Sequence, residues 1–198
     1  MTGNDPYLIL LRVVDALESC GVPYYVSGSL SSIVHGATRS TTDADVVVQF
    51  SAVKIAKVID LLENEFLVNK AAMLDSLRKS KSNNLIHKDS LMKVDLYPIK
   101  DDFFSHAEAK RIVKRPVPTA PQRNIFFNSC EDVTLRKLWW FSLGGHVAAR
   151  QWDDAIALLK LHKTDLDGKY LAVWSEKLGV SDLLKKAQRE AGWPSTTA

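Results

Sequence analysis

The pattern of hydrophobic and polar positions predicts that the chain opens with an amphipathic helix. Apolar residues recur at helical spacing from Leu8 to Leu17, after the favourable helix start Asp5-Pro6, and Gly21 ends the pattern. Three shorter segments follow. PYYVSG predicts a strand, SLSSIVHG predicts a helix, and ADVVVQF predicts a buried strand rich in valine. The expected order is helix, strand, helix, strand.

The middle of the chain continues this alternation. A helix capped by Ser51 is expected to run to about Glu65, and MLDSLRKSKS predicts a short helix or a flexible basic segment. NNLIHK and LMKVDLYPI predict a β-hairpin, whose second strand alternates around Asp95. DDFFSHAEAKRIVKR then predicts a helix that leads into an extended segment.

A composition change suggests two domains. Three of the seven prolines fall in RPVPTAPQR, which predicts a boundary near residues 115–123, so we expect domains over residues 1–118 and 119–198. Four helical patterns follow: CEDVTLRKLWWFSLGG, VAARQWDDAIALLKLH, DGKYLAVWSEKLG and SDLLKKAQREAG.

Composition and charge exclude several classes of protein. With 198 residues and 46% hydrophobic content, the chain can form one sizeable core or two small ones. A net charge of +3 is too small to indicate nucleic-acid binding through bulk electrostatics, although a local basic patch stays open. The two cysteines form no disulfide framework or metal spacing, which favours a cytoplasmic location. No signal peptide or membrane segment is predicted.

Two carboxylates at the start of the valine-rich strand suggest chemistry. Side chains alternate along a strand, so Asp43 and Asp45 point the same way. Such a pair is destabilising unless a cation lies between them, and Mg²⁺ prefers oxygen ligands shared with substrate phosphates. Asp95, with Lys93 and Tyr97 on its own face, could complete the cluster. Three carboxylates on adjacent strands can hold two metals ~3.5–4 Å apart for phosphoryl or nucleotidyl transfer.

The turn at Gly28-Ser29 fits the same chemistry. Glycine lets the backbone approach a phosphate, and Ser29 offers a hydroxyl at the start of a helix. Alone, this turn is more often a simple strand-to-helix connection, DAD is often a solvated strand end, and Asp95 would be an edge carboxylate. Their combination favours a nucleotide site.

These residues resemble a known pattern: GS, thirteen residues, then DAD preceded by RSTT, and later KVDLYPI. The pattern is similar to that of the DNA polymerase beta type nucleotidyltransferase superfamily. The resemblance implies an α+β fold whose mixed sheet is flanked by helices and followed by a C-terminal helical domain. It also implies that Gly28 and Ser29 hold the triphosphate, that Asp43 and Asp45 bind metal, and that Asp95 is the third carboxylate, acting as general base or metal-linked activator.

The C-terminal half resembles the helical segment of AbiEii-like nucleotidyltransferases, over EDVTLRKLWWFSLGGHVAARQWDDAIALLKLH. The resemblance implies that Lys137 contacts the nucleotide phosphates and that Asp154 orients it or shares the site. Without it, Lys137 would be a solvated or snorkelling side chain. Asp153 and Asp154 are about 100° apart on a helix, so only one faces the site; the motif selects Asp154, with Arg150 as its expected helix partner.

Further basic residues have two interpretations. Arg39 and Thr41 share strand parity with Asp43 if the strand starts early, so both are candidate nucleotide contacts, but a salt bridge that orders the loop explains Arg39 equally well. The runs RKSK and KRPVPTAPQR could guide an RNA acceptor, or form a solvated face.

The sequence therefore predicts a Mg²⁺-dependent nucleotidyltransferase of the EC 2.7.7 type, with Mn²⁺ as the alternative ion. It would bind ATP or another NTP in a cleft closed by the helical domain, and transfer NMP to a tRNA, a protein or a small molecule. Two alternatives stay open. One is a nucleotide-binding partner or regulatory module without turnover; the other is the toxin of a toxin-antitoxin pair, which would bind an antitoxin-like protein.

Overall fold

The computed structural model describes residues 5–194 and divides the chain into two compact units. Unit 1 comprises Met1–Leu30 and Ser40–Asn128, and unit 2 comprises Ser31–Arg39 and Ser129–Ala198. The expected boundary at residue 118 therefore differs from the observed division in two ways: the sheet continues to Asn128, and a short N-terminal segment belongs to unit 2.

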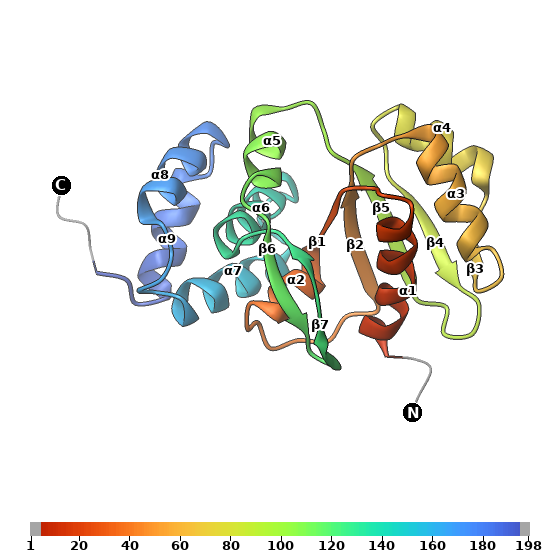
Figure 1. The fold of residues 1–198 in the computed structure, drawn as a ribbon. Helices are drawn as coiled ribbons and strands as arrows, with labels where there is room; N and C mark the ends of the chain where they lie inside the picture. Colours follow the sequence, from red (N-terminus) through yellow and green to blue (C-terminus); the bar gives the residue numbers. More distant parts are fainter. Residues whose placement is uncertain (1–4, 195–198) are drawn as a thin grey trace. The chain divides into compact units, whose positions relative to one another are not determined.

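Unit 1 is built on one mixed sheet of seven strands in the order β3-β4-β5-β2-β1-β7-β6 (Figure 1). The strands are β1 (Tyr24–Ser27), β2 (Asp43–Val48), β3 (Phe66–Leu67), β4 (Asn83–His87), β5 (Lys93–Pro98), β6 (Val113–Val117) and β7 (Ala120–Phe127). The pairs β2–β5 and β1–β7 are parallel, and the other neighbours are antiparallel. The mixed sheet expected from the resemblance is confirmed.

Four helices belong wholly to unit 1: α1 (Pro6–Ser19), α3 (Ala52–Leu62), α4 (Lys70–Arg78) and α5 (Phe103–Ala109). The helix α2 (Gly28–Val34) starts in unit 1 and ends in unit 2. Val14 and Leu17 of the predicted pattern are fully buried in α1, as are Leu10 and Val13, whereas Leu8 at the start of the pattern is exposed. Ser51 occupies the N-cap of α3 without a side-chain capping bond.

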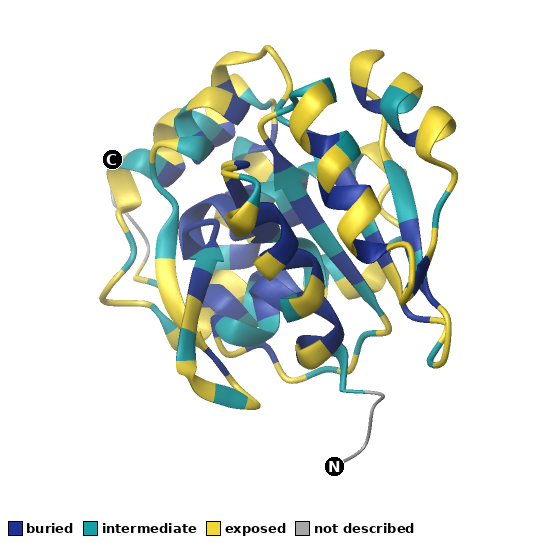
Figure 2. Ribbon diagram, turned by 45° about the vertical axis from the view of Figure 1, so that its right-hand side comes forward, coloured by how far each residue is buried: buried dark blue, intermediate teal, exposed yellow. Residues whose placement is uncertain are grey.

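Alternation along β2 and β5 separates a core face from a polar face. Ala44, Val46 and Val48 of β2 are fully buried, as are Val94 and Leu96 of β5. Figure 2 shows buried and partly exposed positions alternating along the strands. α1 packs on β2 and α4 packs on β5, so the helices cover the apolar face. The remaining side chains of both strands lie on the opposite, polar face of the sheet.

Unit 2 contains four helices that match the four predicted patterns: α6 (Cys130–Leu143), α7 (Ala149–Leu161), α8 (Gly168–Lys177) and α9 (Ser181–Glu190). Ser129 caps α6 by accepting a hydrogen bond from the Asp132 amide. Asp167 caps α8 in the same way, by accepting a hydrogen bond from the Tyr170 amide. Between residues 5 and 194, no helix is both long enough and apolar enough to cross a membrane.

The proline-rich stretch forms a hairpin of the sheet, which explains why it does not mark the boundary. It makes up most of β6, the turn and the start of β7, and β6 is the last strand of the sheet. Proline lacks a backbone donor, but an edge strand tolerates it because one of its sides has no strand partner. Pro116 is an exposed residue of this edge strand.

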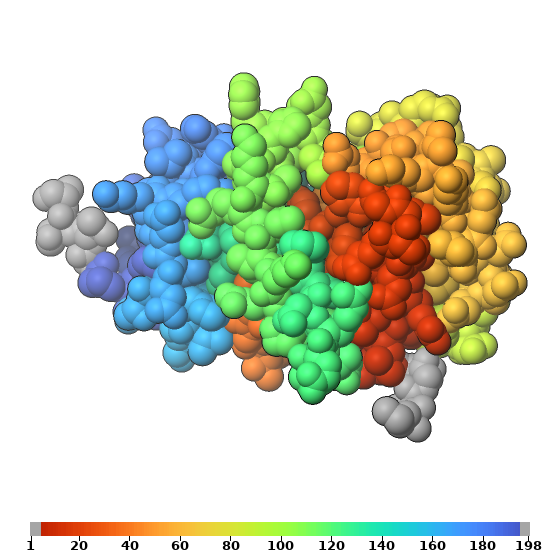
Figure 3. Space-filling view, viewed as in Figure 1, coloured from red at the N-terminus to blue at the C-terminus, as the bar shows by residue number. Residues whose placement is uncertain are grey.

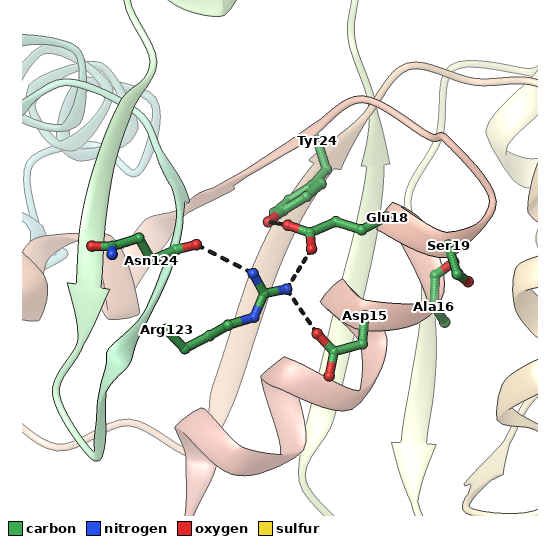
Figure 4. Close-up of polar contacts among 7 residues, drawn as sticks. All are labelled: Asp15, Ala16, Glu18, Ser19, Tyr24, Arg123 and Asn124. Carbon is green, nitrogen blue, oxygen red and sulfur yellow. Dashed lines mark hydrogen bonds and ion pairs between the residues drawn. The ribbon is translucent and has the colours of Figure 1, made fainter.

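A polar cluster fixes β7 against α1 (Figure 4). Arg123 of β7 donates to Asp15 at 2.8 Å and also pairs with Glu18, which accepts a 2.6 Å hydrogen bond from the Tyr24 hydroxyl. In the space-filling view, α1 (red) and β7 (green) meet on one face of unit 1 (Figure 3). Burial alone would raise the pKa of Glu18, but the hydrogen bonds from Tyr24 and Arg123 and the charge of Arg123 outweigh it and lower that pKa.

We expect Arg123→Gln to lower the free energy of unfolding at neutral pH by about 0.5–1 kcal/mol, because the cluster is partly exposed and solvent screens it. The pKa of Glu18 is lower in the folded state, so the contribution exists above the ordinary glutamate pKa and disappears as the pH falls through the lowered value. Urea denaturation from pH 7 to pH 3 measures this. Arg115→Gln, at an exposed position of β6, is the control; a loss for Arg123→Gln that is independent of pH would contradict the account.

Candidate functional site

The parallel pairing of β2 with β5 brings the predicted carboxylates together. Asp45 lies in register with Asp95, and Asp43 lies in register with Lys93. All three carboxylates occupy partly exposed positions that alternate with fully buried ones, so they share the face opposite the apolar core. Two neighbouring strands thus concentrate acidic side chains on one face of unit 1.

The environment of Asp95 reflects this concentration of charge. Burial raises the pKa of Asp95; the charge of Lys93 opposes the shift, the charge of Asp43 adds to it, and a hydrogen bond with Asn84 opposes it. The net direction is upward. The Lys93 ammonium lies 3.9 Å from a carboxylate oxygen of Asp43, and both side chains are about half exposed, so this single cation only partly balances the cluster.

The turn between β1 and α2 lies directly against Asp45. Gly28 has a φ of +62°, and a Cβ built on it would lie only 1.8 Å from a carboxylate oxygen of Asp45. Any side chain at residue 28 would therefore displace Asp45, and the left-handed backbone would add strain. Ser29 follows in the first turn of α2, and Ser27 is paired with Asp45 across the strands.

Two further residues contact the carboxylates and were given no role by the sequence analysis. Tyr97 hydrogen-bonds Asp45, and burial, the charges of Asp45 and Asp95 and this bond raise the pKa of Tyr97. Asn84 of β4 pairs with Asp95 across the sheet. The alternation of side chains along the strand already placed Tyr97 on the same face as Asp95. The position of Asn84 could not be predicted without the register of the hairpin.

The carboxylates do not form a complete metal cage by themselves. Across residues 5–194, no group of three or more His, Cys, Asp or Glu side chains is arranged to hold a metal ion. The donor set nevertheless fits Mg²⁺ or Mn²⁺, which take oxygen ligands and commonly use one or two carboxylates together with substrate phosphates and water.

Unit 2 contains a second charged cluster. Asp154 of α7 accepts from Lys137 of α6 at 2.8 Å and from Arg39 at 3.0 Å. Lys137 is 4% exposed and Asp154 is 6% exposed, so both charges are shielded from water. Two cations therefore share one buried carboxylate.

Arg39 forms a salt bridge, as one of its two interpretations predicts. β2 begins at Asp43, so the early strand start that would align Arg39 with the carboxylates does not occur. Thr41 uses its hydroxyl locally: it accepts from the Asp43 amide at 3.3 Å and approaches the Asp43 carbonyl at 3.2 Å. Both residues thus order the segment before β2.

On α7, the two neighbouring acidic residues differ in burial, as their spacing on a helix predicts. Asp153 is exposed and Asp154 is buried. The expected helix partner, Arg150, is also exposed, and the ion pairs of Asp154 come from Lys137 and Arg39, which are distant in sequence. A single-helix argument could not find such partners.

Three of the basic side chains in the two predicted runs interact with other side chains of the protein. Lys79 pairs with Asp75, Arg123 joins the cluster at α1, and the Lys114 ammonium lies 4.9 Å from the centre of the Phe126 ring. These contacts favour the solvated-face interpretation over an RNA-guiding surface.

Solved structures share the fold over most of the chain. The lincosamide antibiotic adenylyltransferase LnuA, solved with lincomycin, aligns over 77% of this chain and 95% of its own, with a TM-score of 0.51 and 19% identity. The antibiotic-resistance factor ANT(2'')-Ia aligns over 92% and 96% in solution, and over 87% and 96% in complex with adenylyl-2''-tobramycin; both TM-scores are 0.55, at 12% and 10% identity. The chain has a nucleotidyltransferase fold. Its sequence matches no protein-family model and no curated protein.

We expect Asp154→Ala to destabilise the protein by about 3–5 kcal/mol, because it leaves buried Lys137 without its carboxylate. Asp153→Ala removes the neighbouring, exposed carboxylate and should change the free energy of unfolding by less than about 0.5 kcal/mol. Urea denaturation of both variants measures the difference. Adding Lys137→Met to Asp154→Ala should recover part of the loss; equal stability of the two single variants would contradict a buried ion pair.

Proposed function

We propose that the protein is a metal-dependent nucleotidyltransferase, which transfers NMP from an NTP to an acceptor nucleophile and releases pyrophosphate. The observation that carries the proposal is the register of Asp45 with Asp95, with Asp43 on the same face and the Gly28 turn against Asp45. The nucleotidyltransferase fold of the chain supports it. Such a cluster of carboxylates is unfavourable in a protein without a cationic ligand.

In this proposal Asp43, Asp45 and Asp95 hold Mg²⁺ or Mn²⁺ together with oxygens of the nucleotide. When bound, the ion would neutralise phosphate charge and favour attack at the α-phosphorus. The Gly28-Ser29 turn binds the triphosphate, because the absence of a side chain at Gly28 leaves backbone room beside Asp45.

Asp95 then serves as the base. It accepts the proton of the acceptor hydroxyl, whose oxygen forms a bond to the α-phosphorus while the bond to the pyrophosphate oxygen breaks. The register of Asp95 with Asp45 supports this role, because it places the Asp95 carboxylate beside the proposed metal and nucleotide site.

The cluster in unit 2 provides an anion-binding function. Lys137 contacts the nucleotide phosphates, and Asp154 orients Lys137 with the help of Arg39. The ion pair between Lys137 and Asp154 supports this assignment, as does the resemblance of α6 and α7 to the AbiEii-like segment.

We propose ATP as the nucleotide and a small hydroxylated molecule as the acceptor. LnuA is an adenylyltransferase of lincosamide antibiotics, and ANT(2'')-Ia is seen with an adenylylated tobramycin. The ion pairs that Lys79 and Arg123 already form within the protein argue against an RNA acceptor. The alternative is a macromolecular acceptor, as expected for a toxin with an antitoxin-like partner. The assay below tests both classes of acceptor.

We expect the purified protein to transfer label from α-labelled ATP in the presence of Mg²⁺, and Asp45→Asn and Asp95→Asn each to reduce transfer at least about 100-fold. Asp101→Asn, at an exposed carboxylate, should leave the rate unchanged. The assay uses all four NTPs with lincosamides, aminoglycosides, total tRNA and the protein itself as acceptors.

Each outcome has a distinct meaning. Transfer that survives Asp45→Asn would contradict the site, and so would the absence of any metal-dependent NTP binding. NTP binding that requires Asp45 without transfer to any acceptor would favour the nucleotide-binding module over the enzyme.

A further inference from the structure

A buried polar network lies at the end of β1, behind the turn. Glu108 of α5 is 1% exposed, and its two carboxylate oxygens accept hydrogen bonds from the Tyr25 hydroxyl at 3.1 Å and the Asn128 side-chain amide at 3.0 Å. The same amide nitrogen of Asn128 lies 3.3 Å from the hydroxyl oxygen of Ser27. All four residues belong to unit 1.

The network places polar groups among buried apolar side chains, which is unfavourable in free energy unless the groups bond one another. Asn128 is 0% exposed, and the residues around it in β1 and β7, Val26 and Phe127, are fully buried hydrophobics in register with each other. Burying a carboxylate and an amide is unfavourable unless every polar atom is satisfied, and apolar packing is often no less stable. We therefore explain these buried polar groups by the orientation that they impose on neighbouring residues, rather than by a gain in the stability of the fold.

Asn128 connects this network to the candidate site. Its backbone N–H donates to the Val26 carbonyl at 3.1 Å, and its side chain reaches Ser27. Ser27 is paired with Asp45 and immediately precedes Gly28. Asn128 thus holds the last two residues of β1, from which the turn against Asp45 begins.

We propose that Asn128, fixed by Glu108, is a positioning residue for the Gly28-Ser29 turn. Glu108 orients the amide of Asn128, the amide holds Ser27, and Ser27 sets where the chain leaves β1. Neither Asn128 nor Glu108 touches the nucleotide. The inference rests on the proposed phosphate-binding role of the turn for its functional consequence, whereas its structural part concerns the free protein.

Two variants separate positioning from general stability. Asn128→Ala removes the bonds to both Glu108 and Ser27, and Ser27→Ala removes only the bond that reaches the turn. Tyr25→Phe is the matched control, because it deletes a hydrogen bond to the same carboxylate without affecting Ser27. Asn128→Ala and Tyr25→Phe should both lower the free energy of unfolding, so stability alone does not distinguish the roles.

The first measurement is amide hydrogen exchange of residues 28–30 in the ligand-free protein. We expect Asn128→Ala and Ser27→Ala to accelerate exchange there at least about fivefold relative to β5 in the same sample, while Tyr25→Phe does not. Unchanged exchange in both variants, or an equal acceleration in Tyr25→Phe, would overturn the inference whatever the protein's activity.

The second measurement is the affinity for inorganic tripolyphosphate with Mg²⁺. Binding should weaken about tenfold in Asn128→Ala and Ser27→Ala and stay within about twofold of wild type in Tyr25→Phe. Wild-type protein that does not bind tripolyphosphate, together with the expected exchange result, would refute the proposed function and leave the positioning role standing. Tenfold weaker binding in Tyr25→Phe as well would overturn the specific role of Asn128.

Discussion

The parallel pairing of β2 with β5 is the constraint on which the rest of unit 1 depends. Parallel strands in register repeat the same alternation side by side, so one pairing assigns Ala44 and Val94 to the core and Asp45 and Asp95 to the opposite face. A shift of one residue would bury carboxylates beneath the helices. The apolar core and the acidic face are therefore two consequences of the same hydrogen-bond ladder.

The turn and the polar network follow from that pairing. Once Asp45 is fixed, the chain that leaves β1 must pass close to its carboxylate, and Gly28 meets this requirement because it has no side chain and tolerates a positive φ. Keeping the backbone in that position demands support from the other side of β1. Glu108 of α5 and Asn128, which directly follows β7, supply it from positions far from the turn in sequence.

Much of this architecture is predictable from local sequence, and the remainder depends on long-range contacts. Hydrophobic periodicity predicted the strands around Asp43 and Asp95 and the four C-terminal helices, because each pattern lies within one element. Helical spacing could not find the partners of Asp154, since Arg39 and Lys137 come from other segments, and only the family resemblance associated Lys137 with Asp154. The proline-rich stretch misled the boundary because proline signals a break, whereas an edge strand accommodates it. The sequence predicted no role for Glu108, because its burial depends on the tertiary fold.

The central claim is that the face of Asp43, Asp45 and Asp95 binds a divalent cation with a nucleotide. The most direct test is paramagnetic broadening by substoichiometric Mn²⁺ in the NMR spectrum of the wild-type protein with a non-hydrolysable ATP analogue. The account predicts that broadening centres on the amides of Asp45, Asp95 and Gly28 and is reversed by excess Mg²⁺. Broadening centred on exposed carboxylates elsewhere, such as Asp101, with these three amides unaffected, would contradict it.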